Sequence, residues 1–293
     1  MNKKTGYIYL LLTFFIWGSL YVVSKTAMET MSPLFVLMCR YLFSVIVLFF
    51  IVKRTGFTKL RKGHKKIFFG IGFLGYFAAI ACQLIGTHLV DAALSSLINS
   101  LNPVVMPIIA VIFLHEKISM RTCISIVMSV IGVYIILGVG GGGSINPIGI
   151  AVNILSVILW SASSCVVRGI SEYYNPIQVS LYAMAIALIF TIPAAAIDYG
   201  FEPSHITLKG MLAVLYIALV CTALSHTLWN KSLSMLSATT CSLFYPIQPL
   251  TSAVLGIFVL GETITPSFII GAAIICAGIL IVVIKPKQAV LRK

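Results

Sequence analysis

Residues 92–116 read AALSSLINSLNPVVMPIIAVIFLHE, and residues 238–262 read ATTCSLFYPIQPLTSAVLGIFVLGE. At an offset of 146, the two stretches share Ala, Ser-Leu, Pro, Leu and Glu in the same order. A chance alignment of two apolar helices readily matches Leu with Leu or Ile with Ile, but not proline and glutamate in one order. The two stretches therefore indicate an internal repeat.

The repeat extends along the chain in both directions. The further matched pairs are Ile118 with Ile264 and Gly132 with Gly278 at the same offset, and Gly6 with Gly149, Trp17 with Trp160, Lys25 with Arg168 and Ser32-Pro33 with Asn175-Pro176 at an offset of 143. A matched tryptophan is a specific signal because the chain has only 3 of them. We therefore divide the chain into a first repeat, residues 1–143, and a second repeat, residues 144–293.

The composition predicts an all-α polytopic membrane protein. Hydrophobic residues make up 60% of the 293 residues and charged residues only 9%, whereas soluble domains carry about 25% charged residues. A bilayer core needs about 20 apolar helical residues per span. Runs of this length predict ten transmembrane helices, at residues 6–24, 33–52, 67–87, 92–114, 119–138, 149–167, 176–197, 210–230, 237–260 and 266–284.

The loop charges predict the orientation of these spans. Of the 20 Lys and Arg residues, 17 fall at or beyond the span ends on one side, two (Lys25 and Lys209) fall on the other, and Arg40 lies inside a span. Because Lys and Arg favour cytoplasmic loops, both termini are predicted to be cytoplasmic. This placement of the net charge of +13 also argues against a nucleic-acid partner.

Five helices per repeat is an odd number, so the second repeat enters the membrane from the opposite side. Inverted repeats are typical of secondary transporters, which bind their substrates near the midplane between the repeats. Each repeat has a proline-centred fourth span that ends in Leu-x-Glu, as Leu114-His115-Glu116 and as Leu260-Gly261-Glu262. With the ten spans and the inverted repeats, this pattern resembles the EamA family of the drug/metabolite transporter superfamily.

The resemblance implies a transporter that acts by alternating access in the bacterial cell (inner) membrane. Relatives in this family carry amino acids, other metabolites and drugs, and the resemblance favours export. It also implies a structural or gating role for the terminal glutamates Glu116 and Glu262. Oligomeric state stays open between monomer and homodimer.

Two prolines mark the predicted midplane. Pro103 lies about 16 Å into its span at 1.5 Å per residue, and Pro249 lies at a similar depth. A proline within a helix frees the carbonyl group four residues back, which is that of Asn99 or of Tyr245. Since a freed carbonyl group at this depth needs protein or a water-filled cavity, both prolines are candidate hinges, with a simple packing kink as the alternative.

Polar and aromatic side chains follow one face of several predicted spans, as Ser156, Trp160 and Ser164 do. We expect these faces to line a central cavity. The alternatives are hydrogen bonding between helices for the amides and core packing for the indoles. The candidate lining residues are Trp17, Tyr21, Gln83, Asn99, Asn102, Trp160, Ser164, His226, Trp229, Tyr245 and Gln248.

Two ionisable residues within spans are candidates for function. Arg40 is a candidate charge site because a cation inside the membrane is costly and usually marks function, although it could also reach the interface with its long side chain. His226 is a candidate proton carrier because the ordinary pKa of histidine lies near neutrality. The alternative for His226 is hydrogen-bonded packing.

The predicted lining suits a small neutral or zwitterionic metabolite, such as an amino acid or a derivative. A channel or a lipid scramblase is the alternative function. An intramembrane enzyme is much less favoured, because no acidic pair lies mid-span and no metal or nucleophile motif is present. We expect no cofactor and no metal. Proton coupling stays open.

Overall fold

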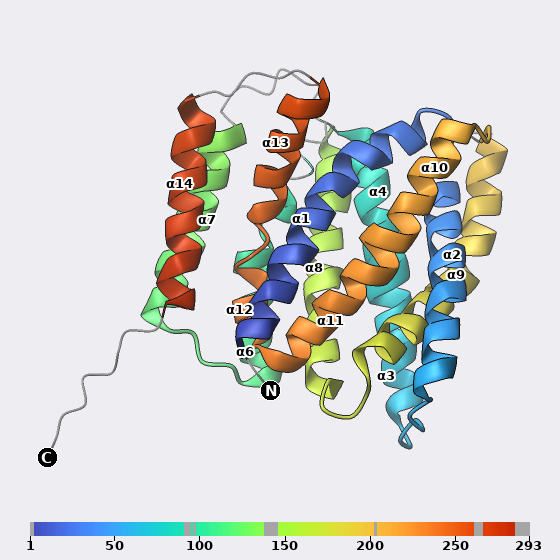
Figure 1. Cartoon of the computed structure of the whole chain (residues 1–293), viewed down its shortest axis with the longest axis horizontal. Helices are drawn as coiled ribbons and strands as arrows, with labels where there is room; N and C mark the ends of the chain where they lie inside the picture. The colour runs from blue at the N-terminus through green and yellow to red at the C-terminus, as the bar shows by residue number, and fades with distance from the viewer. Residues whose placement is uncertain are drawn as a thin grey trace, which may run out of the picture.

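The computed structural model describes residues 3–90, 95, 98–137, 146–201, 204–260 and 266–284. The regular secondary structure of these residues is helical, with no strand among them (Figure 1). The elements of the N-terminal half are α1 (Lys3–Met28), α2 (Pro33–Thr55), α3 (His64–Gly70), η1 (Ile71–Ala78), α4 (Ala79–Leu89), α6 (Asn102–Leu114) and α7 (Met120–Leu137). Those of the C-terminal half are α8 (Pro147–Ile170), α9 (Pro176–Phe201), α10 (Leu208–Tyr216), η2 (Ile217–Leu224), α11 (Ser225–Met235), α12 (Ala238–Ser242), α13 (Ile247–Leu260) and α14 (Pro266–Val283).

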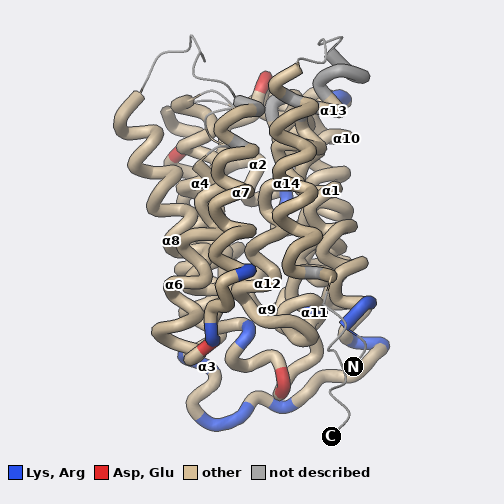
Figure 2. The backbone as a smooth tube through the Cα atoms, turned by 90° about the vertical axis from the view of Figure 1, so that its left-hand side faces the viewer, with Lys and Arg blue, Asp and Glu red and all other residues tan. Residues whose placement is uncertain are grey.

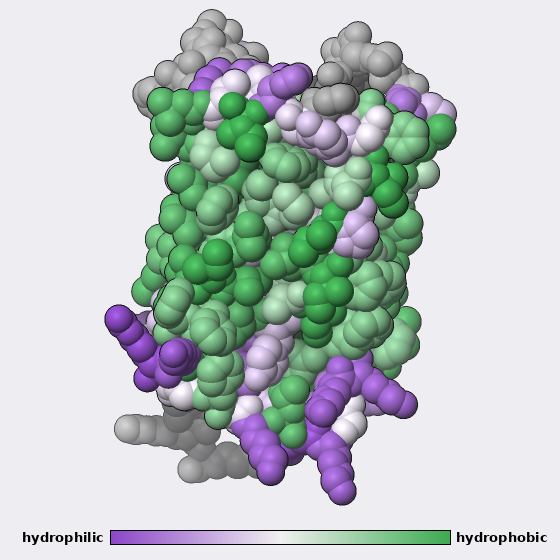
Figure 3. All heavy atoms as spheres, turned by 90° about the vertical axis from the view of Figure 1, so that its right-hand side faces the viewer, coloured by the Kyte–Doolittle hydropathy of each residue, from purple (hydrophilic) through white to green (hydrophobic). Residues whose placement is uncertain are grey.

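The described helices have the character of membrane spans. Six are long and apolar enough to cross a bilayer: α1, α2, α8, α9 and the continuous helices His64–Leu89 and Leu208–Met235. A broad apolar belt separates hydrophilic ends on the face drawn in Figure 3. The protein is therefore an integral membrane protein, as its composition predicts. These helices extend a few residues beyond the predicted spans because their polar ends continue the helix past the apolar stretch.

The predicted fourth span of each half differs from a single continuous helix. Residues 100–101 form a turn before α6, and residues 243–246 form a turn between α12 and α13. Pro103 and Pro249 lie in the first turn of α6 and of α13, where a proline costs little because the first N–H groups of a helix have no partner within it. The two prolines therefore begin helices, and do not kink continuous ones.

The carbonyl groups that these prolines were expected to free are bonded nearby. The carbonyl oxygen of Asn99 accepts a hydrogen bond of 2.8 Å from the side-chain amide of Asn102. That of Tyr245 accepts one of 2.9 Å from the backbone N–H of Gln248. Each carbonyl group therefore meets protein, which is one of the two environments that the sequence left open, and its donor lies within three residues.

Two π-helical segments occupy matching places in the two halves. The segment η1 (Ile71–Ala78) and the segment η2 (Ile217–Leu224) are separated by the offset of 146 that relates the quoted stretches. Side chains of α2 form hydrogen bonds to both segments. The hydroxyl group of Tyr41 donates to the carbonyl oxygen of Tyr76 in η1. The hydroxyl group of Ser44 donates to the carbonyl oxygen of Ala218 in η2, 2.8 Å away. Such segments are frequent at functional sites.

Matching glycines lie at two equivalent helix contacts. A methyl group at Gly6 in α1 would lie 3.0 Å from Cγ of Leu236, and one at Gly149 in α8 would lie 2.7 Å from Cγ1 of Val90. Val90 and Leu236 are again 146 residues apart. The first helix of each half therefore packs closely on the end of the third span of the other half, through α1 with α11 and α8 with α4.

The last helices of the two halves, α7 and α14, pack mainly against each other at one side of the bundle (Figure 1). A methyl group at Gly132 would lie 2.6 Å from Cγ1 of Ile275, and one at Gly278 would lie 3.1 Å from Cβ of Met128. These glycines form a pair of the sequence repeat. Each allows the other helix to approach closely, as small residues do between membrane helices.

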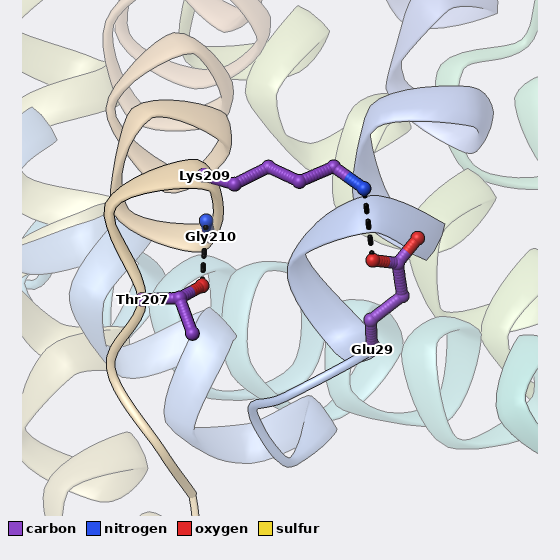
Figure 4. A network of polar contacts seen from close by, with 4 residues as sticks. All are labelled: Glu29, Thr207, Lys209 and Gly210. Carbon is purple, nitrogen blue, oxygen red and sulfur yellow. Dashed lines mark hydrogen bonds and ion pairs between the residues drawn. The ribbon is translucent and has the colours of Figure 1, made fainter.

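Lys and Arg residues gather at the end of the bundle where α1 begins (Figure 2). At the opposite end, Nζ of Lys209 lies 3.0 Å from a carboxylate oxygen of Glu29, joining α10 to the end of α1 (Figure 4). Beside this pair, the hydroxyl group of Thr207 accepts a hydrogen bond of 3.1 Å from the N–H of Gly210 at the start of α10. Both charged side chains are exposed, so the pair contributes up to about 1 kcal/mol.

Candidate functional site

A small cavity of about 30 Å³ lies among helices of both halves. It has room for about two water molecules. Its walls come from α1, α2, α4, α8 and α11 and from the segments next to the breaks in the two fourth spans. The lining residues are Trp17, Leu20, Arg40, Ile80, Gln83, Asn99, Ser156, Trp160, His226 and Tyr245.

Aromatic rings build one wall of the cavity. The ring of Trp17 has its centroid 5.9 Å from that of Trp160, 5.1 Å from that of His226 and 5.6 Å from that of Trp229. The indole N–H of Trp160 donates to the hydroxyl oxygen of Tyr245. All three tryptophans of the chain thus lie in one cluster of fixed rings at the cavity.

Amide side chains form a polar part of the wall. The amide nitrogen of Gln83 donates to Oδ1 of Asn99 over 3.3 Å and to the hydroxyl oxygen of Tyr21 over 3.5 Å. The amide nitrogen of Asn99 donates in turn to the carbonyl oxygen of Ser95, 3.1 Å away. Because each amide has a protein partner, both side chains are held in one orientation.

Arg40 brings a guanidinium group to the cavity. Its side chain is only 1% exposed. It therefore does not extend to the surface of the membrane, which was the alternative considered from the sequence. In the part of the chain that the structure describes, neither Nε nor Nη1 of Arg40 has a hydrogen-bond partner, and no carboxylate pairs with it. Its nearest aromatic contact is the ring of Tyr41, whose centroid lies 5.8 Å from Cζ.

His226 presents an unpaired ring nitrogen. Nδ1 lies 3.1 Å from the carbonyl oxygen of Thr222 and donates to it, so the neutral ring carries its proton on Nδ1. Nε2 is then an acceptor, and it is buried with no partner among the described residues. The cavity therefore joins unpaired donors on Arg40 with an unpaired acceptor on His226.

The structure brings six of the eleven predicted lining residues to the cavity: Trp17, Gln83, Asn99, Trp160, His226 and Tyr245. Five others are buried nearby without lining it: Tyr21, Asn102, Ser164, Trp229 and Gln248. Among these, Asn102 accepts a hydrogen bond of 2.9 Å from the hydroxyl group of Ser161 while donating to Asn99. Asn102 thus joins helices, which is the alternative that the sequence left open.

Two lining residues, Leu20 and Ile80, were not expected from sequence. Both are apolar residues in apolar spans, so nothing in their local pattern sets them apart. Ser156 also lines the cavity, and it lies one turn before Trp160 on the face that was expected to do so.

Glu116 joins the two halves of the chain. Its carboxylate oxygens accept hydrogen bonds from the backbone N–H groups of Ala238, at 2.8 Å, and of Thr239, at 3.1 Å. These N–H groups belong to the first two residues of α12, and they have no acceptor within the helix. The carboxylate of Glu116 supplies that acceptor. Its predicted counterpart, Glu262, lies outside the described residues.

A bundle of apolar helices around a small polar and aromatic cavity is typical of membrane transporters. The model of the EamA-like transporter family matches residues 4–138 and 147–284. The chain therefore belongs to this family, and the resemblance found in the sequence is confirmed. Among the described residues, no group of His, Cys, Asp and Glu side chains could hold a metal ion.

Relatives of known name are also transporters. The uncharacterized transporter YetK of Bacillus subtilis (strain 168) is 27% identical, over 98% of this chain and 90% of its own. A probable amino-acid metabolite efflux pump of Salmonella typhimurium is 26% identical, over 96% of this chain and 95% of its own. A crystal structure that is 17% identical has a TM-score of 0.81 and matches 96% of this chain and 97% of its own, so the two proteins share a fold.

Proposed function

We propose that the protein is a secondary transporter that exports a small neutral or zwitterionic metabolite, such as an amino acid or a derivative. The central cavity carries this proposal, because it combines indoles, amides and one guanidinium group inside an apolar bundle. Both halves of the chain contribute to it. The polar and aromatic groups are Trp17, Arg40, Gln83 and Asn99 from the N-terminal half and Ser156, Trp160, His226 and Tyr245 from the C-terminal half.

Residues 1–143 and 144–293 act, in this proposal, as two inverted repeats of five transmembrane helices each. The equal offset of the π segments η1 and η2 supports this arrangement. The reciprocal contacts of Gly6 and Gly149 also support it, because each joins the first helix of one half to the third span of the other. The family model likewise matches the chain twice.

Both termini lie in the cytoplasm in this proposal, and the membrane is the bacterial inner membrane. The gathering of Lys and Arg at one end of the bundle supports the orientation (Figure 2). The name of the Salmonella relative, an amino-acid metabolite efflux pump, supports both export and the substrate class.

Transport by this route requires the cavity to enlarge. A volume of about 30 Å³ holds water but not a metabolite. The helices around the cavity must therefore separate, first towards one side of the membrane and then towards the other. Contacts between the halves, such as those of Glu116 with the start of α12, lie where this movement would act.

Counterflow in liposomes tests the proposal. Purified protein is reconstituted into liposomes loaded with an unlabelled amino acid, and uptake of the labelled form is followed. A carrier gives transient accumulation that saturates with substrate, whereas a channel gives equilibration without accumulation. Scrambling of a fluorescent lipid is measured in parallel. Lipid movement without counterflow, across a panel of amino acids, would replace the transporter with a scramblase.

A further inference from the structure

The unpaired guanidinium group of Arg40 requires an explanation. Charged side chains inside a membrane are costly and usually mark function, and leaving one buried without a partner costs more than pairing it. The ring of Tyr41 at 5.8 Å is a weak contact. Packing does not require a charge at this place, because the matching residue of the second half is Ala183, also fully buried.

The groups around Arg40 indicate what its partner would be. No described acidic residue lines the cavity, so a bound anion would be the partner of the guanidinium group. A carboxylate matches the planar fork of donors that arginine presents. A cation that brings no carboxylate would instead be repelled by Arg40.

A second unpaired group lines the same cavity. Nε2 of His226 is an acceptor without a partner in the described part of the chain, and Nδ1 is already committed to Thr222. A ligand that satisfies both residues needs an acceptor for Arg40 and a donor for His226. The rings of Trp17 and Trp160 supply apolar surface for its body and π faces that also attract an ammonium group.

We propose that Arg40 binds the carboxylate of the substrate and that His226 accepts a hydrogen bond from its ammonium group. The site thereby selects the head group of an α-amino acid, while the side chain of the substrate lies among the indoles. This inference rests on the proposed transport function and names the groups by which that function recognises its substrate.

Matched ligands test this assignment on the wild-type protein. Leucine carries both head groups, 4-methylpentanoate only the carboxylate, leucinamide only the ammonium group and 4-methylpentanamide neither, and the corresponding phenylalanine series supplies a second body. Two of the 3 tryptophans of the chain line the cavity, and Trp229 packs against both of them, so tryptophan fluorescence reports binding directly. We expect both acids to bind about tenfold or more tightly than the matched amides, and the amino acid to bind more tightly than the simple acid.

Variants of Arg40 test whether its guanidinium group causes the preference for acids. In Arg40→Gln the ratio of the affinity for an acid to that for its matched amide should fall to about one. Arg40→Lys should keep part of the preference because the charge remains. Lys209→Gln is the matched control, since it removes a cation outside the cavity, and it should keep the preference of the wild type. Loss of an unpaired buried charge should not lower the unfolding temperature of Arg40→Gln.

The outcomes separate this inference from the transport function. Equal binding of acids and amides by the wild type, no binding of any acid, or an unchanged preference in Arg40→Gln would overturn the role of Arg40. Equal binding of leucine and 4-methylpentanoate would overturn the role of His226. Counterflow of acids and amides at equal rates would leave the transporter standing without this head-group site. Binding of the acids without counterflow would support the site and remove the transport function.

Discussion

The indole N–H of Trp17 donates a hydrogen bond to the carbonyl oxygen of Cys221, 3.1 Å away and 204 residues further along the chain. The same carbonyl oxygen also accepts from the hydroxyl group of Ser225. Trp17 lies in α1 and Cys221 in the π segment η2, so this bond joins the two halves beside the cavity. Because Ser225 supplies a second donor, losing the indole N–H does not leave the carbonyl oxygen unsatisfied.

Replacing Trp17 should therefore separate its hydrogen bond from its ring. Trp17→Phe should lower the free energy of unfolding by about 1 kcal/mol and change substrate affinity, since the ring lines the cavity. Trp17→Ala removes the centre of the aromatic cluster and should cost about 3–5 kcal/mol. Thermal unfolding, membrane-inserted yield and counterflow affinity are measured together. Normal yield and unchanged affinity in Trp17→Ala would contradict both expected roles.

Asn99 and Asn102 should respond differently to truncation, although both lie in the predicted polar stripe. Asn102→Ala leaves the hydroxyl group of Ser161 and the carbonyl group of Asn99 without their partner, so it should cost about 1–3 kcal/mol with little effect on substrate affinity. Asn99→Ala opens the cavity wall and should raise the KM for transport. The two variants are compared by unfolding temperature and counterflow kinetics. A raised KM in Asn102→Ala with a loss of stability in Asn99→Ala would assign the substrate contact to Asn102 and the packing role to Asn99.

Sequence reasoning predicted the membrane class and the family because apolar run length and the spacing of Trp, Pro and Glu are visible in one chain. It also selected residues of several different spans that the structure brings to one cavity. It could not decide between lining and packing for Asn102 or Trp229, because periodicity assigns a residue to a face without naming the helix opposite. The π segments were missed, since nothing in residues 71–78 or 217–224 departs from an ordinary apolar helix.

Gly75 should be sensitive to a single added methyl group. Such a group would lie 1.9 Å from Oγ and 2.4 Å from Cβ of Ser163 in α8, so η1 and α8 would have to separate. We expect Gly75→Ala to lose about 1–3 kcal/mol, measured as unfolding temperature in detergent.

Gly70→Ala is the matched control for Gly75→Ala. Apart from the adjoining residues and backbone of its own helix, no atom lies within 4 Å of the added methyl group at Gly70, and alanine is the better helix former. Adding Ser163→Gly to Gly75→Ala should recover part of the loss. Equal unfolding temperatures for Gly75→Ala and Gly70→Ala would show that η1 and α8 lie far enough apart to accommodate the added methyl group.

Reporter fusions test the proposed orientation. Fusions after residues 60 and 290 should report a cytoplasmic location, and fusions after residues 143 and 203 an external one, because Lys and Arg lie almost wholly on one side. Alkaline phosphatase and green fluorescent protein give opposite signals for the two sides. An external signal after residue 290 would contradict the ten-helix count and, with it, the inverted repeat.

His226 is the residue through which proton coupling would act. It is the histidine that lines the cavity, and no described carboxylate lies beside it. If protons drive export, accumulation should depend on a pH gradient in the wild type and lose that dependence in His226→Gln. Glutamine keeps a hydrogen-bond acceptor at this place but cannot titrate. Counterflow at saturating substrate should therefore persist with a raised KM, because exchange of the loaded carrier needs no net proton movement.

Two results would remove His226 from the coupling mechanism. Accumulation by the wild type that ignores the pH gradient would mean that the substrate gradient alone drives transport. Gradient dependence that survives in His226→Gln would transfer the role to a carboxylate, and Glu116 is then the first to replace. Its carboxylate binds the start of α12 from the other half, so protonation there would weaken a contact between the halves. Glu116→Gln would in that case abolish the dependence that His226→Gln had left intact.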